Sequence, residues 1–488
     1  VSGRAIPKLL HHVSLSLLHC RCRDVSSSLP FDGLYNSTFP GFCQWHSANK
    51  NGWDFPADPV VFWRHGGILP VFLDVFKKCA IFVDGDKIAK ISYDEKPDVS
   101  GYEVIDLNGK YVTPGLVNPH VHLFGTGMPS KVISGGGAQK LVMKIVKTKL
   151  GDKILDALVK SAARQQLLSG VTTLRAVGDF KYSDVRLRDK INSGKVQGPR
   201  LQVSGPAITV PGGHGDGTFS MTSDTLDGLR ALVRQNKERG VDFIKICVTG
   251  GVIDAKVKGE PGEVKMSLEQ TKAVVDEAHK LGLRVASHTE SFKGVEITAA
   301  AGVDTVEHGA PLTPEMAAEM KATNSAMDVT YSPALPLKML DPSITLLDPI
   351  CVYNTEIVVS NMTKGAKNCI DEGILLGMGT DSSCPFATQY NMWREVVFFQ
   401  KCVGVSNAYA LSVATLNNAK LMGLDNVCGT VEDGKSADMI VMSKNPLDDL
   451  TALRDLDKVI VRGEVIDKPL PKRNETIEKE LDEITKKI

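Results

Sequence analysis

From residue 79 onward, apolar positions follow two alternating periods. Short runs rich in β-branched residues, typical of strands, are separated by segments in which apolar residues recur every three or four positions, as in amphipathic helices. Eight strands are predicted, at residues 115–122, 171–177, 201–208, 242–248, 284–288, 305–308, 328–332 and 374–380. Eight strands alternating with helices predict a (β/α)8 TIM barrel, although an open doubly wound sheet shows the same alternation.

Strands are also predicted on both sides of this alternation. Residues 80–83 and 88–91 flank a turn at Asp84-Gly85-Asp86, and strand patterns return at residues 434–442 and 458–466. Because strands before and after a barrel can pair with each other, we expect a small β-sandwich domain built from residues 78–113 and 425–466. The barrel itself would span residues 114–424. The highly charged residues 467–488 are predicted to form a solvated helix or tail.

The first 77 residues follow neither period, and we treat them as an atypical, irregular or unassigned N-terminal segment. Residues 8–18 resemble a signal peptide only weakly, because His11, His12 and two serines interrupt the apolar run. The most apolar stretch, residues 60–76, contains Arg64, His65 and Asp74 and is too short and too polar for a membrane span.

Composition narrows the class of protein. The chain has 57 Lys+Arg and 57 Asp+Glu, without a long run of like charge, which argues against nucleic-acid or membrane partners. Of its 10 cysteines only Cys20 and Cys22 are closely spaced, so neither a disulfide framework nor a thiolate zinc site is expected. A cytoplasmic setting is therefore favoured over secretion.

Candidate chemistry gathers at the ends of the predicted strands. His120 and His122 stand at positions i and i+2 of the first strand, so that both imidazoles point to the same side. The full set is His120, His122, Lys245, His288, His308 and Asp381. The C-terminal ends of barrel strands form one rim, where these side chains should converge. Burying four imidazoles, a carboxylate and a lysine together would be costly unless they shared a cation, so a metal site is predicted.

Several motifs resemble the metal-dependent amidohydrolase superfamily. They are Pro114-Gly115-Leu116 through His120-Val121-His122, the separate His288 and His308, Gly379-Thr380-Asp381 and Gly434-Lys435-Ser436-Ala437-Asp438. Further motifs are similar to the prolidase/imidazolonepropionase-like branch, which includes the fungal ochratoxin amidohydrolases. These are Pro211-Gly212-Gly213-His214-Gly215, Ile244-Lys245-Ile246 followed by Thr249-Gly250-Gly251, and Val306-Glu307-His308-Gly309. The resemblance extends over about residues 79–466.

The resemblance implies a binuclear metal centre, with two zinc ions or another divalent metal. His120, His122 and Asp381 would bind one ion, His288 and His308 would bind the other, and a carbamate on Lys245 would bridge them. The residue chemistry agrees, because burial lowers the pKa of a lysine and its neutral amine can then add carbon dioxide. Two alternatives stay open: Lys245 snorkels from its strand, or a single metal uses part of the set.

A bridging hydroxide with Asp381 as general base and then general acid would hydrolyse an amide. We therefore predict an enzyme that hydrolyses C–N bonds in small molecules such as N-acyl amino acids, Xaa-Pro dipeptides or ochratoxin-like amides. One alternative is an imidazolonepropionase-like hydrolase of cyclic C–N bonds with one metal. An alternative of another class is a catalytically silent oligomeric scaffold. A homo-oligomer is expected.

Three further residues are candidates for substrate contacts. His214, in a glycine-rich loop after the third strand, either contacts substrate or caps its own loop. Arg175, near the end of the second strand, pairs either with a substrate carboxylate or with a structural acid such as Asp179. Tyr331, at the end of the seventh strand, is placed to donate a hydrogen bond to the substrate carbonyl. The loop at residues 250–262 is glycine-rich enough for a lid.

Overall fold

The structure is a computed structural model. It describes residues 80–93, 97–105, 107, 110–129 and 137–488, together with two short strands, β1 (Cys43–Gln44) and β2 (Val61–Phe62). Apart from these strands, the expectations for residues 1–77, including the signal-like residues 8–18 and the apolar residues 60–76, lie outside the described residues.

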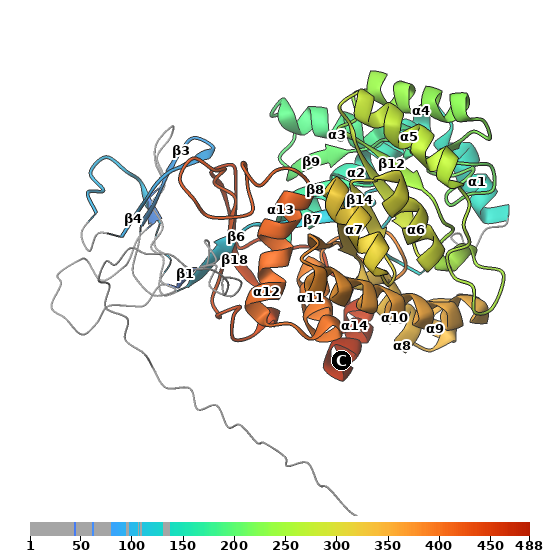
Figure 1. The fold of residues 1–488 in the computed structure, drawn as a ribbon. Coiled ribbons are helices and arrows are strands. Elements are labelled where there is room, and N and C mark those ends of the chain that lie inside the picture. The colour runs from blue at the N-terminus through green and yellow to red at the C-terminus, as the bar shows by residue number, and fades with distance from the viewer. Residues whose placement is uncertain are drawn as a thin grey trace, which may run out of the picture. The chain divides into compact units, whose positions relative to one another are not determined.

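Parallel strands form the centre of the fold (Figure 1). One sheet has the order β11-β10-β12-β13-β14-β15-β16 and another the order β7-β8-β9. The strands of the two sheets are β7 (Leu116–Val121), β8 (Val171–Ala176), β9 (Arg200–Val203), β10 (Ala207–Thr209), β11 (Ser220–Thr222), β12 (Phe243–Cys247), β13 (Arg284–Thr289), β14 (Thr305–His308), β15 (Ala326–Val329) and β16 (Leu376–Met378). Backbone N–H groups link the two sheets: that of Asp381 donates to His120 and that of Asp242 to Val203, both at 2.8 Å.

Two predicted strands differ from the structure. The third is divided into β9 and β10, because Gly205 adopts the left-handed φ of +62° between them. The seventh was expected to run to residue 332 but ends at Val329, and Tyr331 begins helix α8 (Tyr331–Met339). The carboxylate of Glu395 accepts the N–H groups of Tyr331 and Ser332 at 2.7 and 2.6 Å, which stabilises the start of this helix.

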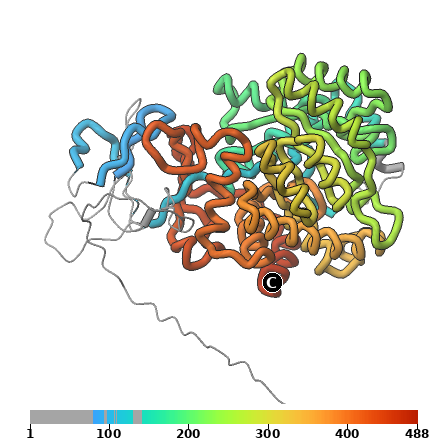
Figure 2. The backbone as a smooth tube through the Cα atoms, in the orientation of Figure 1, coloured from blue at the N-terminus to red at the C-terminus, as the bar shows by residue number. Residues whose placement is uncertain are grey.

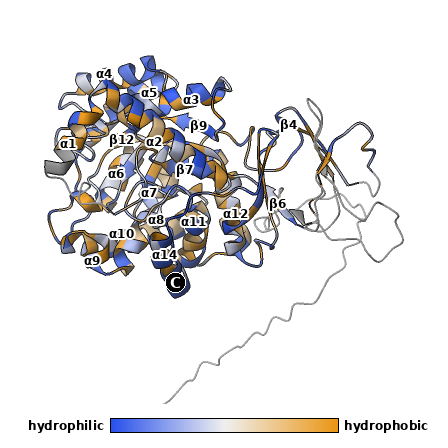
Figure 3. Ribbon diagram, turned by 180° about the vertical axis from the view of Figure 1, so that it is seen from behind, coloured by the Kyte–Doolittle hydropathy of each residue, from blue (hydrophilic) through white to orange (hydrophobic). Residues whose placement is uncertain are grey.

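Helices alternate with the strands, so the fold is α/β, and the helices carry both hydrophilic and hydrophobic residues (Figure 3). Helix α5 (Leu268–Lys280) begins with a capping box, in which Ser267 and Gln270 cap each other's backbone. No helix within the described residues is long and apolar enough to span a membrane.

Besides α8, the described α-helices are α1 (Gly137–Val146), α2 (Lys149–Leu168), α3 (Ser183–Asn192), α4 (Leu226–Glu238), α5 (Leu268–Lys280), α6 (Phe292–Ala301), α7 (Pro314–Thr323), α9 (Pro342–Thr345), α10 (Pro349–Glu372), α11 (Met392–Phe399), α12 (Asn407–Ser412), α13 (Asn418–Leu421) and α14 (Glu475–Lys487).

Strands from both flanks of the parallel sheets pair with each other, and the backbone tube shows these flanking segments side by side (Figure 2). β6 lies antiparallel to β17, and the sheet has the order β1-β6-β17-β18-β19. The predicted hairpin is present as β3 and β4, and β5 pairs with β2. These strands are β3 (Ala80–Asp84), β4 (Lys87–Ser92), β5 (Val104–Ile105), β6 (Tyr111–Pro114), β17 (Met439–Met442), β18 (Leu456–Val461) and β19 (Glu464–Asp467). A separate apolar cluster joins both flanks through residues that include Ile81, Val112 and Met439.

The C-terminal segment is a docked helix and not the solvated segment that its charge suggested. Ile477, Leu481 and Ile484 occupy one face of α14 and are buried. The buried guanidinium of Arg394 in α11 donates hydrogen bonds to Glu478 at 3.1 Å and Asp482 at 3.0 Å. The sequence did not reveal this face, because its few apolar residues are separated by many charged residues.

Gly379 lies where the chain leaving β16 passes β7. A Cβ atom at this position would lie 2.4 Å from the Cβ of His120 and 2.8 Å from its backbone nitrogen. We expect Gly379→Ala to push these segments apart, to destabilise the protein by about 1–3 kcal/mol and to displace His120. Urea denaturation and bound-metal analysis measure both effects. Gly250→Ala, whose Cβ would meet nothing nearer than 3.5 Å, is the control, and equal stability of the two variants would contradict this prediction.

Candidate metal centre

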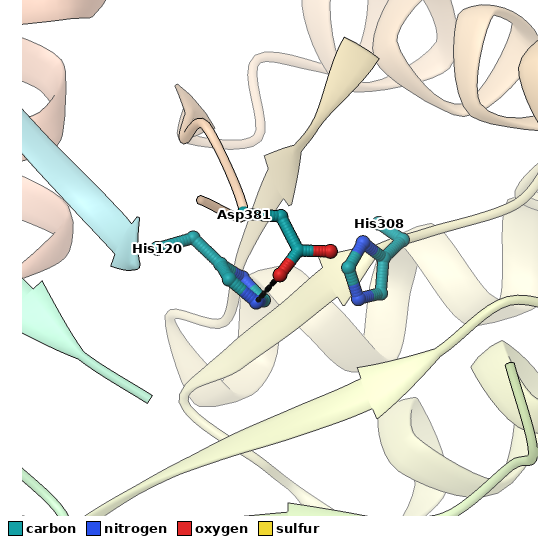
Figure 4. Close-up of side chains that lie close together, drawn as sticks. All are labelled: His120, His308 and Asp381. Atoms are coloured by element: carbon teal, nitrogen blue, oxygen red, sulfur yellow. Dashed lines mark ion pairs between the residues drawn. The ribbon is translucent and has the colours of Figure 1, made fainter. Parts of the chain in front are cut away.

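The strand ends bring the predicted metal ligands to one place. His120 comes from the end of β7, His308 from the end of β14, and Asp381 from the segment after β16. Figure 4 shows these three side chains facing one another, and one ligand atom from each lies within 4.8 Å of the others. Such convergence of buried nitrogen and oxygen donors is the arrangement that a divalent cation requires.

His120, His122 and Asp381 form the first group. The Oδ1 atom of Asp381 lies 3.5 Å from Nε2 of His120 and 3.3 Å from Nε2 of His122. The other ring nitrogens are occupied: Nδ1 of His120 donates to Glu307 at 2.7 Å, and Nδ1 of His122 donates to the carbonyl of Gly178 at 2.8 Å. Partners of this kind fix the rings of metal-binding histidines and leave Nε2 for the cation.

The charge states of this group suit metal binding. Burial, assisted by Lys245, lowers the pKa of His120 to about 4, so that the imidazole is neutral. Burial would raise the pKa of Asp381, but His120 and His122 hold it well below its usual value, so that the carboxylate is ionised. Neutral imidazole and ionised carboxylate are the forms that coordinate zinc.

His288 and His308 form the second group. Nδ1 of His288 and Nε2 of His308 face each other at 2.8 Å, and Nδ1 of His308 shares a hydrogen bond with the Thr330 hydroxyl at 2.7 Å. Burial holds the pKa of both imidazoles well below the ordinary value. The side chain of Glu290 is also buried here, with a ligand atom within 4.8 Å of both rings. Burial raises the pKa of the Glu290 carboxyl to about 8.

Lys245 projects from β12 into the interior. Its side chain is buried at 2% exposure, and its Nζ has no hydrogen-bond partner among the described residues. Burial lowers the pKa of the amine. A snorkelling lysine would carry its ammonium group into water, so that alternative is wrong. An amine buried without a partner is what carbamate formation needs, because the neutral amine is the reactive species.

Two of the candidate ligands have strained backbones. His308 has φ +67° and Asp381 has φ +45°, a left-handed conformation that is uncommon outside glycine and concentrates at functional sites. The turn at His308 interrupts strand alternation. The adjacent residues Glu307 and His308 therefore both reach the candidate site, Glu307 through His120 and His308 through His288.

Arg175 lies in the interior and contacts Glu307. Its guanidinium donates to Glu307 at 2.8 Å, to the carbonyl of Pro119 at 2.7 Å and to the hydroxyl of Thr305 at 3.2 Å. With 4% exposure, Arg175 therefore takes the structural role that the sequence left open. The acid is Glu307, not Asp179, whose carboxylate accepts hydrogen bonds from Phe180 and Ser183.

The other two candidates for substrate contacts have different positions. His214 stacks on His288, with ring centroids 4.2 Å apart, and its Nδ1 is hydrogen-bonded to Asp254 in the loop after β12. It therefore lines the candidate site. Tyr331 is fully buried, and its hydroxyl is hydrogen-bonded to Thr363 of α10 at 3.0 Å. Its predicted position at a strand end is wrong, because helix α8 begins there.

Sequence reasoning missed Glu290 and Glu307. Glu290 follows His288 at the i+2 spacing that drew attention to His120 and His122, so the same signal was available. Glu307 stands within the Val306-Glu307-His308-Gly309 motif, but strand alternation would direct it away from its neighbour His308. Its contact with His120 joins residues 187 positions apart, which no local pattern reveals.

Comparison with known proteins identifies the family of the chain. The profile described as "Amidohydrolase family" matches residues 111–466. The chain belongs to the amidohydrolase family. This amidohydrolase is 38% identical to a Bifidobacterium longum protein assigned as a prolidase, with a TM-score of 0.73 over 83% of this chain and 94% of that one. It is 28% identical to a Xaa-Pro dipeptidase with methionine bound in its active site, with a TM-score of 0.70 over 80% and 95% of the two chains.

Curated relatives of the amidohydrolase carry two further names. The ochratoxinase of Aspergillus niger is 23% identical over 316 residues, which are 60% of this chain and 64% of the relative, less than two thirds of its length. The imidazolonepropionase of Thermoplasma acidophilum is 24% identical over 417 residues, 80% of this chain and 90% of the relative. These names confirm the resemblance drawn from the motifs, and the structural likeness implies a TIM-barrel-like α/β fold.

Proposed function

We propose that this amidohydrolase is a metal-dependent enzyme that hydrolyses amide C–N bonds in small molecules. One observation carries the proposal: His120, His308 and Asp381 converge beside a buried Lys245 whose Nζ has no hydrogen-bond partner in the described part of the chain. N-acyl amino acids, Xaa-Pro dipeptides and ochratoxin-like amides are the substrate classes considered. The prolidase and dipeptidase names of the more similar structures support the dipeptides among them.

The donor set fits two divalent ions, with zinc preferred because neutral imidazoles and carboxylates are its ligands. His120, His122 and Asp381 would hold one ion and His288 and His308 the other, with a carbamate on Lys245 shared between them. When bound, such ions act as Lewis acids and lower the pKa of nearby water. The ionised Asp381 carboxylate accepts the proton of the attacking water and passes it to the leaving nitrogen. Glu307 and the carbonyl of Gly178 hold the imidazoles in place throughout.

Metal removal tests this proposal. We expect the purified protein to contain zinc or another divalent ion, to lose amide hydrolysis on chelation and to recover it when zinc is added. Elemental analysis and activity on a panel of N-acyl amino acids and dipeptides measure this, and native mass spectrometry detects a carbon dioxide adduct on Lys245. Hydrolysis that persists in protein shown to be free of metal would exclude the mechanism.

A hydrolase of cyclic C–N bonds with one metal is the second candidate, favoured by the match to 90% of an imidazolonepropionase. One metal per chain and an unmodified Lys245 would distinguish it from the first candidate. The third, a catalytically silent scaffold, gains no support, because all six predicted ligands are present and buried.

The finer features of the fold are proposals of the same kind. We propose that residues 114–424 close into a (β/α)8 barrel, and hydrogen bonds between the sheets, such as Asp381 to His120, support this. The pairing of β6 with β17 supports a small β-sandwich of residues 78–113 and 425–466. We also propose a cytoplasmic location, which the six free cysteines of the described residues support, as in a reducing compartment. A homo-oligomer is proposed separately. Light scattering of the purified protein tests the oligomer.

A further inference from the structure

Glu290 is a buried acid beside the second histidine pair to which the mechanism above gives no role. It directly follows β13, and a ligand atom of its side chain lies within 4.8 Å of those of His288 and His308. The backbone N–H of Val252, in the loop after β12, donates to its Oε2 atom at 2.7 Å. Its own N–H donates to the hydroxyl of Thr249 at 3.0 Å. One hydrogen bond thus holds the carboxylate at the wall of the candidate site, and another holds the backbone of the same residue.

The neighbouring acid in this wall differs from Glu290 in having a cationic partner. Asp254 is paired with the imidazole of His214 and also accepts the N–H of Gly251 at 2.9 Å. Glu290 takes part in no ion pair with the described residues, and its one hydrogen bond through the side chain comes from Val252. A buried carboxylate without a salt bridge is costly even with the His214 imidazole nearby, so a cation supplied by a ligand would stabilise its ionised form.

The chemistry of an amide substrate indicates which cation this is. The inference places the scissile carbonyl beside the ion that His288 and His308 would hold, with the acyl side of the substrate toward Glu290. In a peptide with a free N-terminus, the α-ammonium group is attached to the carbon next to that carbonyl. In an N-acyl amino acid, no ammonium group stands there.

We propose that Glu290 binds the α-ammonium group of the substrate and thereby selects dipeptides with a free N-terminus, of the Xaa-Pro type, over N-acyl amino acids. This inference rests on the proposed function. The backbone N–H of Val252 orients one carboxylate oxygen, and a charge-assisted hydrogen bond to ammonium satisfies the other. Glu290 could instead be an additional ligand of the second metal, and the experiment below distinguishes that role from substrate binding.

The test compares two substrates that differ only in the ammonium group, L-alanyl-L-proline and N-acetyl-L-alanyl-L-proline. We expect the zinc-loaded enzyme to favour the free dipeptide in kcat/KM by about 100-fold, the effect of one desolvated charge pair. Glu290→Gln keeps the acceptor for Val252 but removes the charge. It should abolish most of this preference, mainly through KM, while the bound zinc and the rate on the acetylated substrate stay near the wild-type values.

Two variants serve as controls. Glu263→Gln removes an exposed acid that pairs only with Lys265 and should leave the preference unchanged. Glu290→Asp should restore part of it. Binding of L-alanine against N-acetyl-L-alanine, measured by titration calorimetry on the zinc-loaded protein, gives a readout independent of turnover, and Glu290→Gln should weaken only the former.

The inference is overturned if Glu290→Gln slows both substrates equally, if it loses zinc, or if the wild-type enzyme shows no preference. Loss of zinc would assign Glu290 as a metal ligand. Cleavage of N-acyl amino acids alone would refute the inference and leave the proposed function intact. Failure to cleave any amide of the panel with zinc bound would refute the proposed function and the inference together.

Discussion

Asp381→Asn is expected to lower kcat/KM by about 10³-fold or more, the effect of losing both a metal ligand and the general base. The carboxylate lies 3.5 Å from His120 and 3.3 Å from His122, and these rings hold its pKa well below the usual value. The ionised group therefore binds a cation and accepts a proton. The amide nitrogen of asparagine neither binds a cation nor accepts a proton. The amide oxygen binds metal only weakly.

Steady-state kinetics and zinc content of purified Asp381→Asn measure both losses. Asp227→Asn is the matched control, because this side chain is 96% exposed and pairs only with Arg230, so activity should stay near wild type. If Asp381→Asn retained more than about a tenth of the activity, Asp381 would not be the general base.

Glu307→Gln is expected to destabilise the protein by about 3–5 kcal/mol, the cost of breaking one side of a buried ion pair. Glu307 is fully buried between Arg175 and His120, at 2.8 and 2.7 Å from their nitrogen atoms. Gln removes the charge that compensates Arg175 and leaves a weaker acceptor for Nδ1 of His120. Zinc affinity should fall as well, because partners of metal-binding histidines typically contribute 10–100-fold.

The same variant should change the pH dependence of stability. Burial would raise the pKa of Glu307, but the Arg175 guanidinium and His120 hold it well below the ordinary value of 4.5. An acid with a lowered pKa stabilises the fold above the unfolded-state pKa, and this stabilisation is lost as the pH falls below it. Wild-type stability should thus decline as the pH falls below about 4.5, and less steeply in Glu307→Gln.

Urea denaturation at several pH values measures these effects. Glu372→Gln is the control, because its ion pair with Lys321 is about half exposed and should contribute at most about 1 kcal/mol. Equal destabilisation by the two substitutions would contradict the role assigned to Glu307.

Residues on strands were predicted more successfully than residues in irregular segments. His120 and His122 were recognised because strand alternation directs both to one side, and the ends of parallel strands meet at one rim. Tyr331 was misplaced because the N–H groups of Tyr331 and Ser332 are capped by Glu395, some 60 residues later, which starts a helix where the sequence alone suggests a strand. The burial of α14 was missed for a related reason, since its partner Arg394 lies in a distant helix.

The sequence by itself determined the order of strands and helices and the six side chains expected to bind metal. It did so because hydrophobic periodicity is a local property and because the motifs lie within short segments. The tertiary structure decided which acids hold those side chains. Arg175 and Glu307 are 132 positions apart, and Glu290 is held at the wall of the site by the loop carrying Val252. Contacts of this kind depend on how strands are brought together in space, and a buried charge depends on its neighbours there and not on its neighbours in the chain.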